Sequence, residues 1–255
     1  MARDADVLVL DTEDPLAVAA VGAIHAGDVA ALKQLLAEHP GLATARLGDY
    51  DGRDGGGMSR TLLHVVADWP GHYPNGAATV AALTAAGADV NARFTGPHTE
   101  TPLHWAASSD DVAVLDALLD EGADIDAPGA VIGGGTPLDD ARAFAQWHTA
   151  HRLVERGART TMQDAATLGL ADRLESFFAG AESPGPEEIN RAFWGACHGG
   201  RQQCAKFLLD RGADRDWIPD WENSTPLDAA TRSGAVDLVA WLRSRGAATA
   251  AELDR

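Results

Sequence analysis

The segment Thr101–Ala107, with the sequence TPLHWAA, combines a helix start with a face of small residues. A threonine hydroxyl can cap the N-terminus of a helix, and Pro102 follows at the first helical position, where its missing N–H costs nothing. Leu103 is placed to point inward, and the alanines let a neighbouring helix approach closely. Segments with related starts begin at Thr61, Thr136 and Thr225. The four segments predict a chain built from repeated short helices.

A second signal closes the unit that begins at Thr101. Gly122 lies 21 residues further on and is followed by Ala123 and Asp124. Glycine can end a helix in the left-handed conformation, and two short helical patterns lie between Thr101 and Gly122. One unit thus consists of a helix, a turn, a second helix and a glycine that ends the second helix. On these residues the chain resembles the ankyrin repeat, whose signature is Thr-Pro-Leu-His-x-Ala with a period of about 33 residues.

The resemblance implies an all-α fold, an ankyrin-repeat solenoid of about seven helix-turn-helix units with irregular insertions. We expect units to start near residues 18, 61, 101, 136, 160, 191 and 225. They would form a single domain of residues 18–249, with residues 1–17 as an N-terminal extension and residues 250–255 as a tail. Insertions fall at residues 46–60 and 69–76, and in a solenoid such loops frequently lie on the binding face.

The net charge of the chain limits the classes of partner that it is expected to bind. The chain has 38 acidic and 20 basic residues and a formal net charge of −18. This negative charge repels phosphate backbones, so neither nucleic acid nor an anionic membrane is expected as a partner. A basic protein, a cation or a neutral small molecule is easier to accommodate. Cys197 and Cys204 fall at core positions of one repeat and are expected as buried reduced thiols, which favours a cytoplasmic setting. The excess of arginine and alanine over lysine suggests a bacterial origin.

The resemblance also implies where a partner would bind, because ankyrin repeats build a concave groove from their finger loops and first helices. Tryptophans in such a groove are suited to anchor a partner, since they offer a large contact area at low entropic cost. Transferring the positions repeat by repeat gives the candidate binding residues Trp69, His72, Tyr73, Phe94, His98, Trp105, Ser109, Asp140, Phe144, Asp164, His198, Trp217, Trp221 and Arg232.

Two histidines are predicted to be structural. His64 and His104 stand at the fourth position of the repeat signature, where the imidazole usually bonds to the capping threonine or nearby backbone. No Ser-His-Asp order, phosphate-binding glycine loop or zinc-ligand spacing occurs in the chain. We therefore expect neither a cofactor nor a metal site.

Two functions remain from different classes. The first is a non-enzymatic protein-protein interaction scaffold with an acidic, tryptophan-bearing groove, as the resemblance implies. The alternative is a small-molecule pocket in the same groove, covered by the loop at residues 46–60. In that pocket Asp140 or Asp164, partly desolvated by aromatic neighbours, would act as a base of raised pKa with His98 or His198 near it. Because no motif defines a catalytic site, we favour the scaffold over an enzyme.

Overall fold

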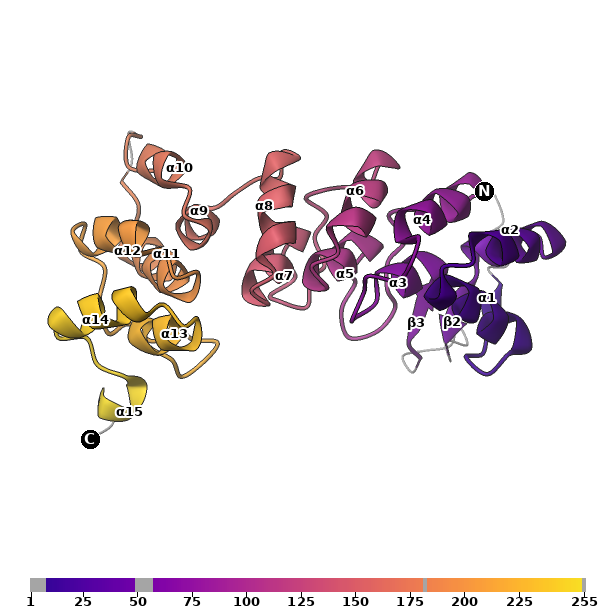
Figure 1. Ribbon diagram of the computed structural model, residues 1–255. Helices are drawn as coiled ribbons and strands as arrows, with labels where there is room; N and C mark the ends of the chain where they lie inside the picture. The colour runs from indigo at the N-terminus through magenta and orange to yellow at the C-terminus, as the bar shows by residue number, and fades with distance from the viewer. Residues whose placement is uncertain (1–7, 49–56, 181–182, 254–255) are drawn as a thin grey trace, which may run out of the picture. The chain divides into compact units, whose positions relative to one another are not determined.

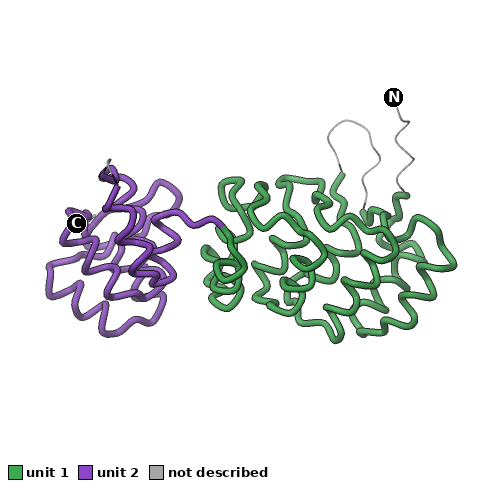
Figure 2. The backbone as a smooth tube through the Cα atoms, turned by 90° about the horizontal axis from the view of Figure 1, so that it is seen from above, with its two compact units in different colours: residues 1–158 green, residues 159–255 purple. Residues whose placement is uncertain are grey.

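The computed structural model describes residues 8–48, 57–180 and 183–253. Its contacts divide the chain into two compact units, residues 1–158 and residues 159–255 (Figure 2). The boundary falls at a junction with no room for a finger loop, since only Ala158 and Arg159 separate Gly157, the end of the fourth repeat, from the expected start of the fifth. The sequence treats residues 18–249 as one domain, and that assignment stays a prediction.

The first unit contains four consecutive helix pairs (Figure 1). The pairs are α1 Pro15–Ala26 with α2 Val29–Glu38, α3 Leu62–Ala67 with α4 Gly76–Ala85, α5 Pro102–Ser108 with α6 Val112–Asp120, and α7 Pro137–Ala143 with α8 Trp147–Glu155. A short 3-10 helix, η1, spans Leu42–Thr44. First helices pack against first helices, as α3 does on α5 and α5 on α7, while the second helices α4, α6 and α8 form a parallel row. This is the two-layer packing of a repeat stack.

A small sheet adds to the helices of the first unit. Strand β1, Val9–Leu10, is parallel to β2, Arg46–Gly48, which is antiparallel to β3, Ser59–Thr61, with Arg46 opposite Thr61. The ends of the insertion at residues 46–60 thus form a hairpin, and residues 49–56, which carry the predicted cover over the groove, lie outside the described residues. The sequence predicts no strands here, because segments of two or three residues are too short to show an alternating pattern.

The second unit contains three helix pairs and a short final helix. They are α9 Met162–Leu168 with α10 Ala171–Ser176, α11 Pro186–His198 with α12 Gln202–Leu209, α13 Pro226–Arg232 with α14 Val236–Ser244, and α15 Ala250–Leu253. Helix α11 packs on both α9 and α13. Cys197 and Cys204 are free and buried, as expected, and burial raises the pKa of the Cys197 thiol. With seven helix pairs in the described residues, the expected fold class is confirmed.

Threonine caps start most of the first helices. In Thr101 and its counterparts, the hydroxyl faces the backbone N–H of the third helical residue, whose side chain reaches back to the N–H of the threonine. This reciprocal arrangement occurs at Thr61, Thr101, Thr136, Thr161 and Thr225. The inward leucines are buried as predicted, with Leu103 fully inaccessible.

Two first helices begin earlier than the sequence predicts. Helix α1 starts at Pro15 instead of near Val18, because the Asp14 carboxylate accepts a hydrogen bond of 2.8 Å from the N–H of Leu16 and so caps it. Helix α11 starts at Pro186, five residues before Arg191, and a proline at the first position is again compatible with a helix start. Within the described residues, no helix combines the length and apolar character needed to span a bilayer.

Candidate functional site

Two groups of candidate residues come together, one in each unit. The first, the acid-aromatic cluster, consists of Phe94, His98, Glu100, Trp105 and Asp140. Its members come from the finger at residues 92–100, from α5 and from α7. Trp105 and Asp140 occupy the same position in consecutive repeats, since each is the fifth residue counted from its capping threonine. Helix α5 packs against α7, and Glu100 links the two positions, since it accepts from the Trp105 indole and neighbours the Asp140 carboxyl.

Glu100 is the centre of the acid-aromatic cluster. Its side chain is only 7% exposed, and its Oε2 atom accepts a hydrogen bond of 2.9 Å from the indole N–H of Trp105. Its Oε1 atom accepts one of 3.1 Å from the backbone N–H of Val131, which lies in the next finger. The Nδ1 atom of His98 lies 2.8 Å from Oε2. Glu100 therefore ties two fingers and α5 together.

Aromatic rings surround Glu100 on one side. The rings of Phe94 and His98 are stacked with centroids 4.6 Å apart, and Phe94 lies 5.6 Å from Trp105. His64 meets Trp105 edge to face at 4.9 Å. Such contacts fix the orientation of the rings relative to one another and add to the stability gained from burial. The position of Trp105 is thus fixed by rings as well as by its hydrogen bond.

Asp140 is the most unusual side chain of the acid-aromatic cluster. It is fully buried, and its carboxyl group has the Glu100 carboxyl and the backbone N–H of Ile132 as neighbours. Burial raises the pKa of Asp140 well above its usual range, and the neighbouring Glu100 carboxyl raises it further. A raised pKa by desolvation agrees in direction with the prediction, but Glu100, the second cause, is a residue that the sequence did not point to. Two adjoining carboxyl groups in a dry site hold a proton between them, since both cannot ionise.

His64 and His104 are structural, as predicted. In each, Nδ1 accepts a hydrogen bond from the backbone N–H of the capping threonine and lies 2.9 Å from its hydroxyl oxygen. The opposite ring nitrogen of His64 lies 3.2 Å from the carbonyl oxygen of Glu100, to which it donates. Burial lowers the pKa of His64 to about 3 and that of His104 to about 4, so both rings are neutral near pH 7.

The second group, the Trp-Arg cluster, consists of Arg191, Trp194, Trp217, Trp221 and Arg232. Trp194 is buried and donates its indole N–H to the carbonyl oxygen of Ser224 at 3.0 Å. Trp221 meets Trp194 edge to face at 5.6 Å and Trp217 at 5.8 Å. The sequence predicts Trp217, Trp221 and Arg232 as binding residues, and the structure joins them with Trp194 in one cluster.

Two arginines hold the Trp-Arg cluster in place. The guanidinium carbon of Arg191 lies 4.8 Å from the ring centre of Trp221, and that of Arg232 lies 5.7 Å from Trp194. Arg232 also makes two hydrogen bonds of 2.9 Å to the carboxylate of Glu222. His198 stacks on Trp194 at 5.4 Å. Trp221 nevertheless remains 45% exposed, so the cluster presents one supported indole to solvent.

The turn insertion of the second repeat has a mainly structural role. His72 donates its backbone N–H to the Asp111 carboxylate at 2.7 Å, and its Nε2 lies 3.2 Å from the carbonyl oxygen of Ser109. The buried Ser109 hydroxyl donates to the carbonyl of Ala67, and Tyr73 stacks on His25 at 4.4 Å. Only Trp69, at 76% exposed, presents a large apolar surface from this loop.

Two further candidates differ in their environments. Asp164 is 3% exposed, and its carboxylate accepts hydrogen bonds from the N–H and hydroxyl of Thr161 at 2.8 and 2.6 Å. It therefore caps α9. Phe144, the residue that follows the end of α7, is 47% exposed. The binding roles of His72, Tyr73, Ser109 and Asp164 remain predictions, and structural bonds account for their positions.

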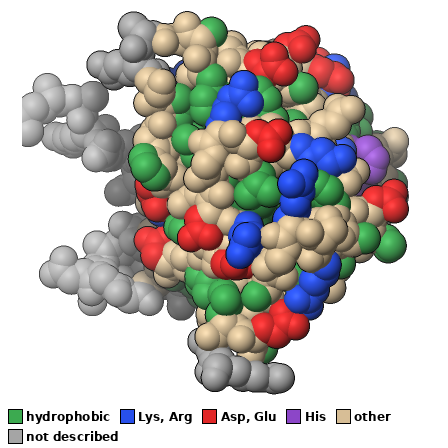
Figure 3. Space-filling view, turned by 90° about the vertical axis from the view of Figure 1, so that its left-hand side faces the viewer, with side chains coloured by type: hydrophobic (Ala, Val, Ile, Leu, Met, Phe, Trp, Pro, Cys, Tyr) green, Lys and Arg blue, Asp and Glu red, His purple; other side chains and the backbone are tan. Residues whose placement is uncertain are grey.

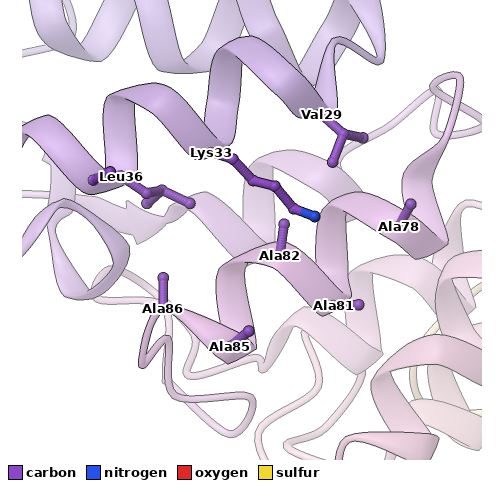
Figure 4. Close-up of a pocket in the computed structure, with 9 residues that line it drawn as sticks. Val29, Lys33, Leu36, Ala78, Ala81, Ala82, Ala85 and Ala86 are labelled. Carbon is purple, nitrogen blue, oxygen red and sulfur yellow. The ribbon is translucent and has the colours of Figure 1, made fainter.

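A cavity of about 490 Å³ lies between the second helices α2 and α4, and no residue of either cluster lines it (Figure 4). Five alanines of α4 and its C-terminal end line it, and the Lys33 side chain runs along it with its ammonium group near Ala82. Sites for small molecules generally combine apolar walls with a few convergent polar groups, and Lys33 is the one charged side chain in this lining. Among the described residues, no group of three or more His, Cys, Asp or Glu side chains is placed to hold a metal ion.

The two units differ in charge. Residues 1–158 carry 23 acidic and 9 basic side chains, whereas residues 159–255 carry 15 acidic and 11 basic ones. Figure 3 shows one face of the molecule on which lysine and arginine side chains form a broken band with acidic side chains scattered along it. The acidic excess of the chain is thus concentrated in the first unit.

The sequence missed Glu100 and Arg191. Glu100 directly precedes the capping Thr101, but the corresponding residues Arg60, Gly135 and Ser224 share no property with it, so no periodic signal marks the position. Arg191 lies in the part of α11 that was assigned to the start of the repeat. Its contact with Trp221 depends on the course of the finger between α12 and α13, which the repeat signature does not specify.

Comparison with known proteins supports the repeat assignment. Residues 98–130 match the family model described as ankyrin repeat, and residues 162–252 match that described as ankyrin repeats (3 copies). A curated relative is the Ankyrin repeat and KH domain-containing protein CBG24701 of Caenorhabditis briggsae, 29% identical over 174 residues that make up 65% of this chain. The chain spans about 6% of the length of that relative. Among solved structures, the human ASB11 ankyrin repeat domain is 28% identical, with a TM-score of 0.45, and the match covers 74% of this chain and 85% of that one. The family models thus identify ankyrin repeats at residues 98–130 and 162–252.

Proposed function

We propose that this chain of ankyrin repeats is a non-enzymatic protein-protein interaction module. Ankyrin repeats generally mediate such interactions, because stacked repeats expose an extended row of finger loops and first helices. In this chain, those elements carry Trp105 and Phe144 in the first unit and Trp217 and Trp221 in the second. The partner would contact these first-helix and finger residues.

The observation that carries the proposal is the Trp-Arg cluster. A binding hot spot typically contains tryptophan or arginine, held rigidly and ready to be desolvated by the partner. Trp221 meets this description, since Arg191 covers one side of its ring and Trp194 supports its edge while 45% of the residue stays exposed. Ordering such a side chain in advance lowers the entropic cost of binding.

The alternative of an acid-base pocket has less support. Asp140 has the raised pKa that a general base would need, but its side chain is fully buried and offers no surface to a substrate. Asp164 is engaged in capping α9. The cavity between α2 and α4 contains neither residue. The protein-binding function is therefore the better supported of the two.

The test is affinity purification with the full chain as bait, followed by affinity measurement with each recovered partner. Trp221→Ala removes the exposed indole, and we expect it to weaken binding by at least about tenfold, as for other hot-spot tryptophans. Val236→Ala is the matched control, because Val236 is 76% exposed on the second helix α14 of the same unit. A partner that binds Trp221→Ala and the wild-type chain with equal affinity would contradict the assigned surface.

A further inference from the structure

A row of basic and aromatic side chains crosses the second helices of the second unit. The ammonium group of Lys206 and the guanidinium carbon of Arg245 each lie 5.7 Å from the ring centre of Trp241. The guanidinium carbon of Arg211 lies 3.4 Å from the ring centre of Phe207, which follows Lys206 in α12. These five residues are called the cation-aromatic row. They belong to α12, α14 and the residues just after these helices.

The cation-aromatic row stands where the first unit has an ion pair. The sequence Arg-Gly-Ala ends three repeats, beginning at Arg156, Arg211 and Arg245. Arg156 donates to the Asp116 carboxylate of the preceding second helix, α6, at 2.7 Å. Lys206 takes the place of Asp116 in its own repeat, since each lies six residues before the glycine that ends the repeat. Arg245 therefore has a lysine on the preceding second helix where Arg156 has an aspartate.

The three cations of the row have no carboxylate of their own. Lys206, Arg211 and Arg245 are exposed, and within residues 8–48, 57–180 and 183–253 none of them forms an ion pair. Nearby arginines do, as Arg243 does with Glu252 at 2.6 Å. Acidic residues outnumber basic ones by 38 to 20 in this chain, so three unmatched cations in one row are unexpected. An anionic group from outside can approach them without displacing an internal carboxylate.

The second helices of the second unit are also more basic than the rest of the chain. Residues 171–176, 201–211 and 236–245, which contain α10, α12 and α14, carry six basic and four acidic side chains. The four acidic side chains are Asp172, Glu175, Asp210 and Asp237. On the side of the second unit where α12 and α14 lie, lysine and arginine side chains form a band with hydrophobic side chains between them (Figure 3). The local potential therefore favours an anion in spite of the negative net charge.

We propose that the cation-aromatic row binds an acidic segment of a protein partner, whose aspartate or glutamate carboxylates bond to Lys206, Arg211 and Arg245. Clusters of arginine are a recurrent means of recognising acidic motifs, because bonds between two charged groups are strong. The rings of Phe207 and Trp241 support the cations, so less side-chain freedom is lost on binding. This inference rests on the proposed protein-binding function for the class of partner. It assigns a different surface, on the second helices instead of the fingers and first helices.

A single-stranded nucleic acid fits the row less well than an acidic peptide does. Its bases need aromatic faces on which to stack. Phe207 and Trp241 are only partly exposed, and the chain's own cations lie over both rings. A nucleic acid also carries a negative charge at every phosphate, so the 15 acidic side chains of the unit repel it more strongly than they repel a few carboxylates.

The test compares two pentapeptides that differ in charge. Acetyl-Glu-Glu-Leu-Glu-Glu-amide, and its counterpart with glutamine in place of each glutamate, are titrated into the ¹⁵N-labelled full chain at low ionic strength. The readout is the indole N–H resonance of Trp241, which is assigned with Trp241→Phe. We expect the acidic peptide to shift this resonance and the glutamine peptide to bind at least about tenfold more weakly. An equal response to both peptides, or a response confined to the indoles of Trp217 and Trp221, would overturn the inference.

Three variants test the cations directly. Lys206→Gln, Arg211→Gln and Arg245→Gln should each weaken binding of the acidic peptide by about two- to fivefold, as expected for exposed charge pairs. Arg156→Gln is the matched control, because Arg156 has the equivalent place in the fourth repeat and its loss changes the net charge equally. It should bind the peptide as the wild-type chain does. Thermal melting establishes that each variant is folded, and unchanged binding by the three variants would exclude the row as the receptor.

An octamer of uridine nucleotides is titrated in parallel. If it binds more tightly than the acidic peptide and the same three variants weaken it, the row is a nucleic-acid site and the inference is wrong. Weaker binding of the octamer than of the peptide supports an acidic protein segment as the ligand.

The proposed function can fail separately, because it depends on Trp221. If the acidic peptide does not bind while Trp221→Ala loses the partner, the cation-aromatic row is wrong and the Trp-Arg cluster stands. If the peptide binds as expected while Trp221→Ala binds its partner normally, the Trp-Arg cluster is wrong and the row stands.

Discussion

Asp139 and Asp140 are consecutive residues of α7 whose carboxyl pKa values are shifted in opposite directions. Burial alone would raise the pKa of Asp139, but the charge of Arg142 and the donors of Thr136 outweigh it and lower the pKa. Asp140 is buried beside another acid and its pKa is raised. One carboxylate therefore stabilises the fold near pH 7 and its neighbour destabilises it.

Asp140→Asn should stabilise the protein near pH 7. The amide has nearly the volume of the carboxyl group and can donate a hydrogen bond to Glu100. The amide does not titrate, whereas the carboxyl group of Asp140 must take up a proton when the chain folds near pH 7, which costs free energy. We expect a gain on the order of 2 kcal/mol in the free energy of unfolding. Urea unfolding at pH 7 measures it. A loss of stability would contradict this expectation and mean that the Asp140 carboxyl group makes a net favourable interaction in the folded chain.

The stability gained by Asp140→Asn should increase with pH. The folded-state pKa of Asp140 lies above its unfolded value of 3.8, so the wild-type chain loses stability as pH rises between the two values. The advantage of Asp140→Asn should therefore shrink on acidification and vanish near pH 4. Asp139→Asn is the control and should behave in the opposite way, with a loss of about 1 kcal/mol at pH 7 as the bonds to Arg142 and Thr136 weaken.

His64 and His104 should make the first unit sensitive to mild acid. Their folded pKa values of about 3 and about 4 lie below the ordinary value of 6.5, so protons bind to the unfolded chain first as pH falls. Their contribution is complete above pH 6.5 and decreases below it. Between pH 7 and pH 5 each histidine should cost about 2 kcal/mol of unfolding free energy.

Urea unfolding at pH 7, 6 and 5 checks this, with His64→Asn as the test variant. Asparagine retains an acceptor for the capping threonine but does not titrate, so the variant should be less stable at pH 7 and lose less on acidification. A variant with the same pH slope as the wild-type chain would contradict the assignment of the effect to His64.

Gly195 lies where α11 packs closely against α9. A Cβ atom there would lie 2.4 Å from the hydroxyl oxygen of Thr167, which is held by its own bond of 2.7 Å to the Gln163 carbonyl. Gly195→Ala should therefore cost about 1–3 kcal/mol of unfolding free energy. Gly22→Ala is the matched change within α1, where a Cβ would meet nothing within 4 Å, and it should stabilise by up to about 1 kcal/mol. Urea unfolding of both variants measures the difference in sign.

Arg191 should control how firmly Trp221 is held. Arg191→Gln removes the cation above the indole and should lose about 0.5–1 kcal/mol of interaction at this exposed site. We expect the fluorescence of Trp221 to become easier to quench with acrylamide, measured as the difference between each protein and its Trp221→Phe counterpart. Arg245→Gln provides the control, because Arg245 faces Trp241 on α14 instead. An unchanged quenching constant in Arg191→Gln would contradict the supporting role.

The sequence predicts the repeated features well, because each has a local cause. A capping threonine and a following proline mark α5, α7 and α13, and the imidazoles of His64 and His104 take the places that the signature assigns to them. Register also places Trp105 and Asp140 at equivalent positions of adjacent first helices, which Glu100 links. The start of α1 was missed because an aspartate, Asp14, replaces the threonine at the cap.

The contacts that join the candidate residues were less predictable. Glu100 and Arg191 belong to positions without a periodic identity, and their partners come from fingers whose course depends on long-range hydrogen bonds. The bond from the Val131 amide to Glu100, across 31 residues, is one such case. Strand β1 likewise exists only because a distant segment, β2, offers a pairing edge.

The third residue of the first helix differs between repeats, so acid should destabilise some repeats more than others. It is histidine in α3 and α5 and aspartate in α7, α9 and α13. Only the former two helices carry an imidazole there that unfolding exposes to protonation between pH 7 and pH 5. Because each repeat contacts only its neighbours, the stack can open locally where it is weakest. A protease active at pH 5 should therefore cut first within the second and third repeats, and the order of cleavage along the chain would change with pH.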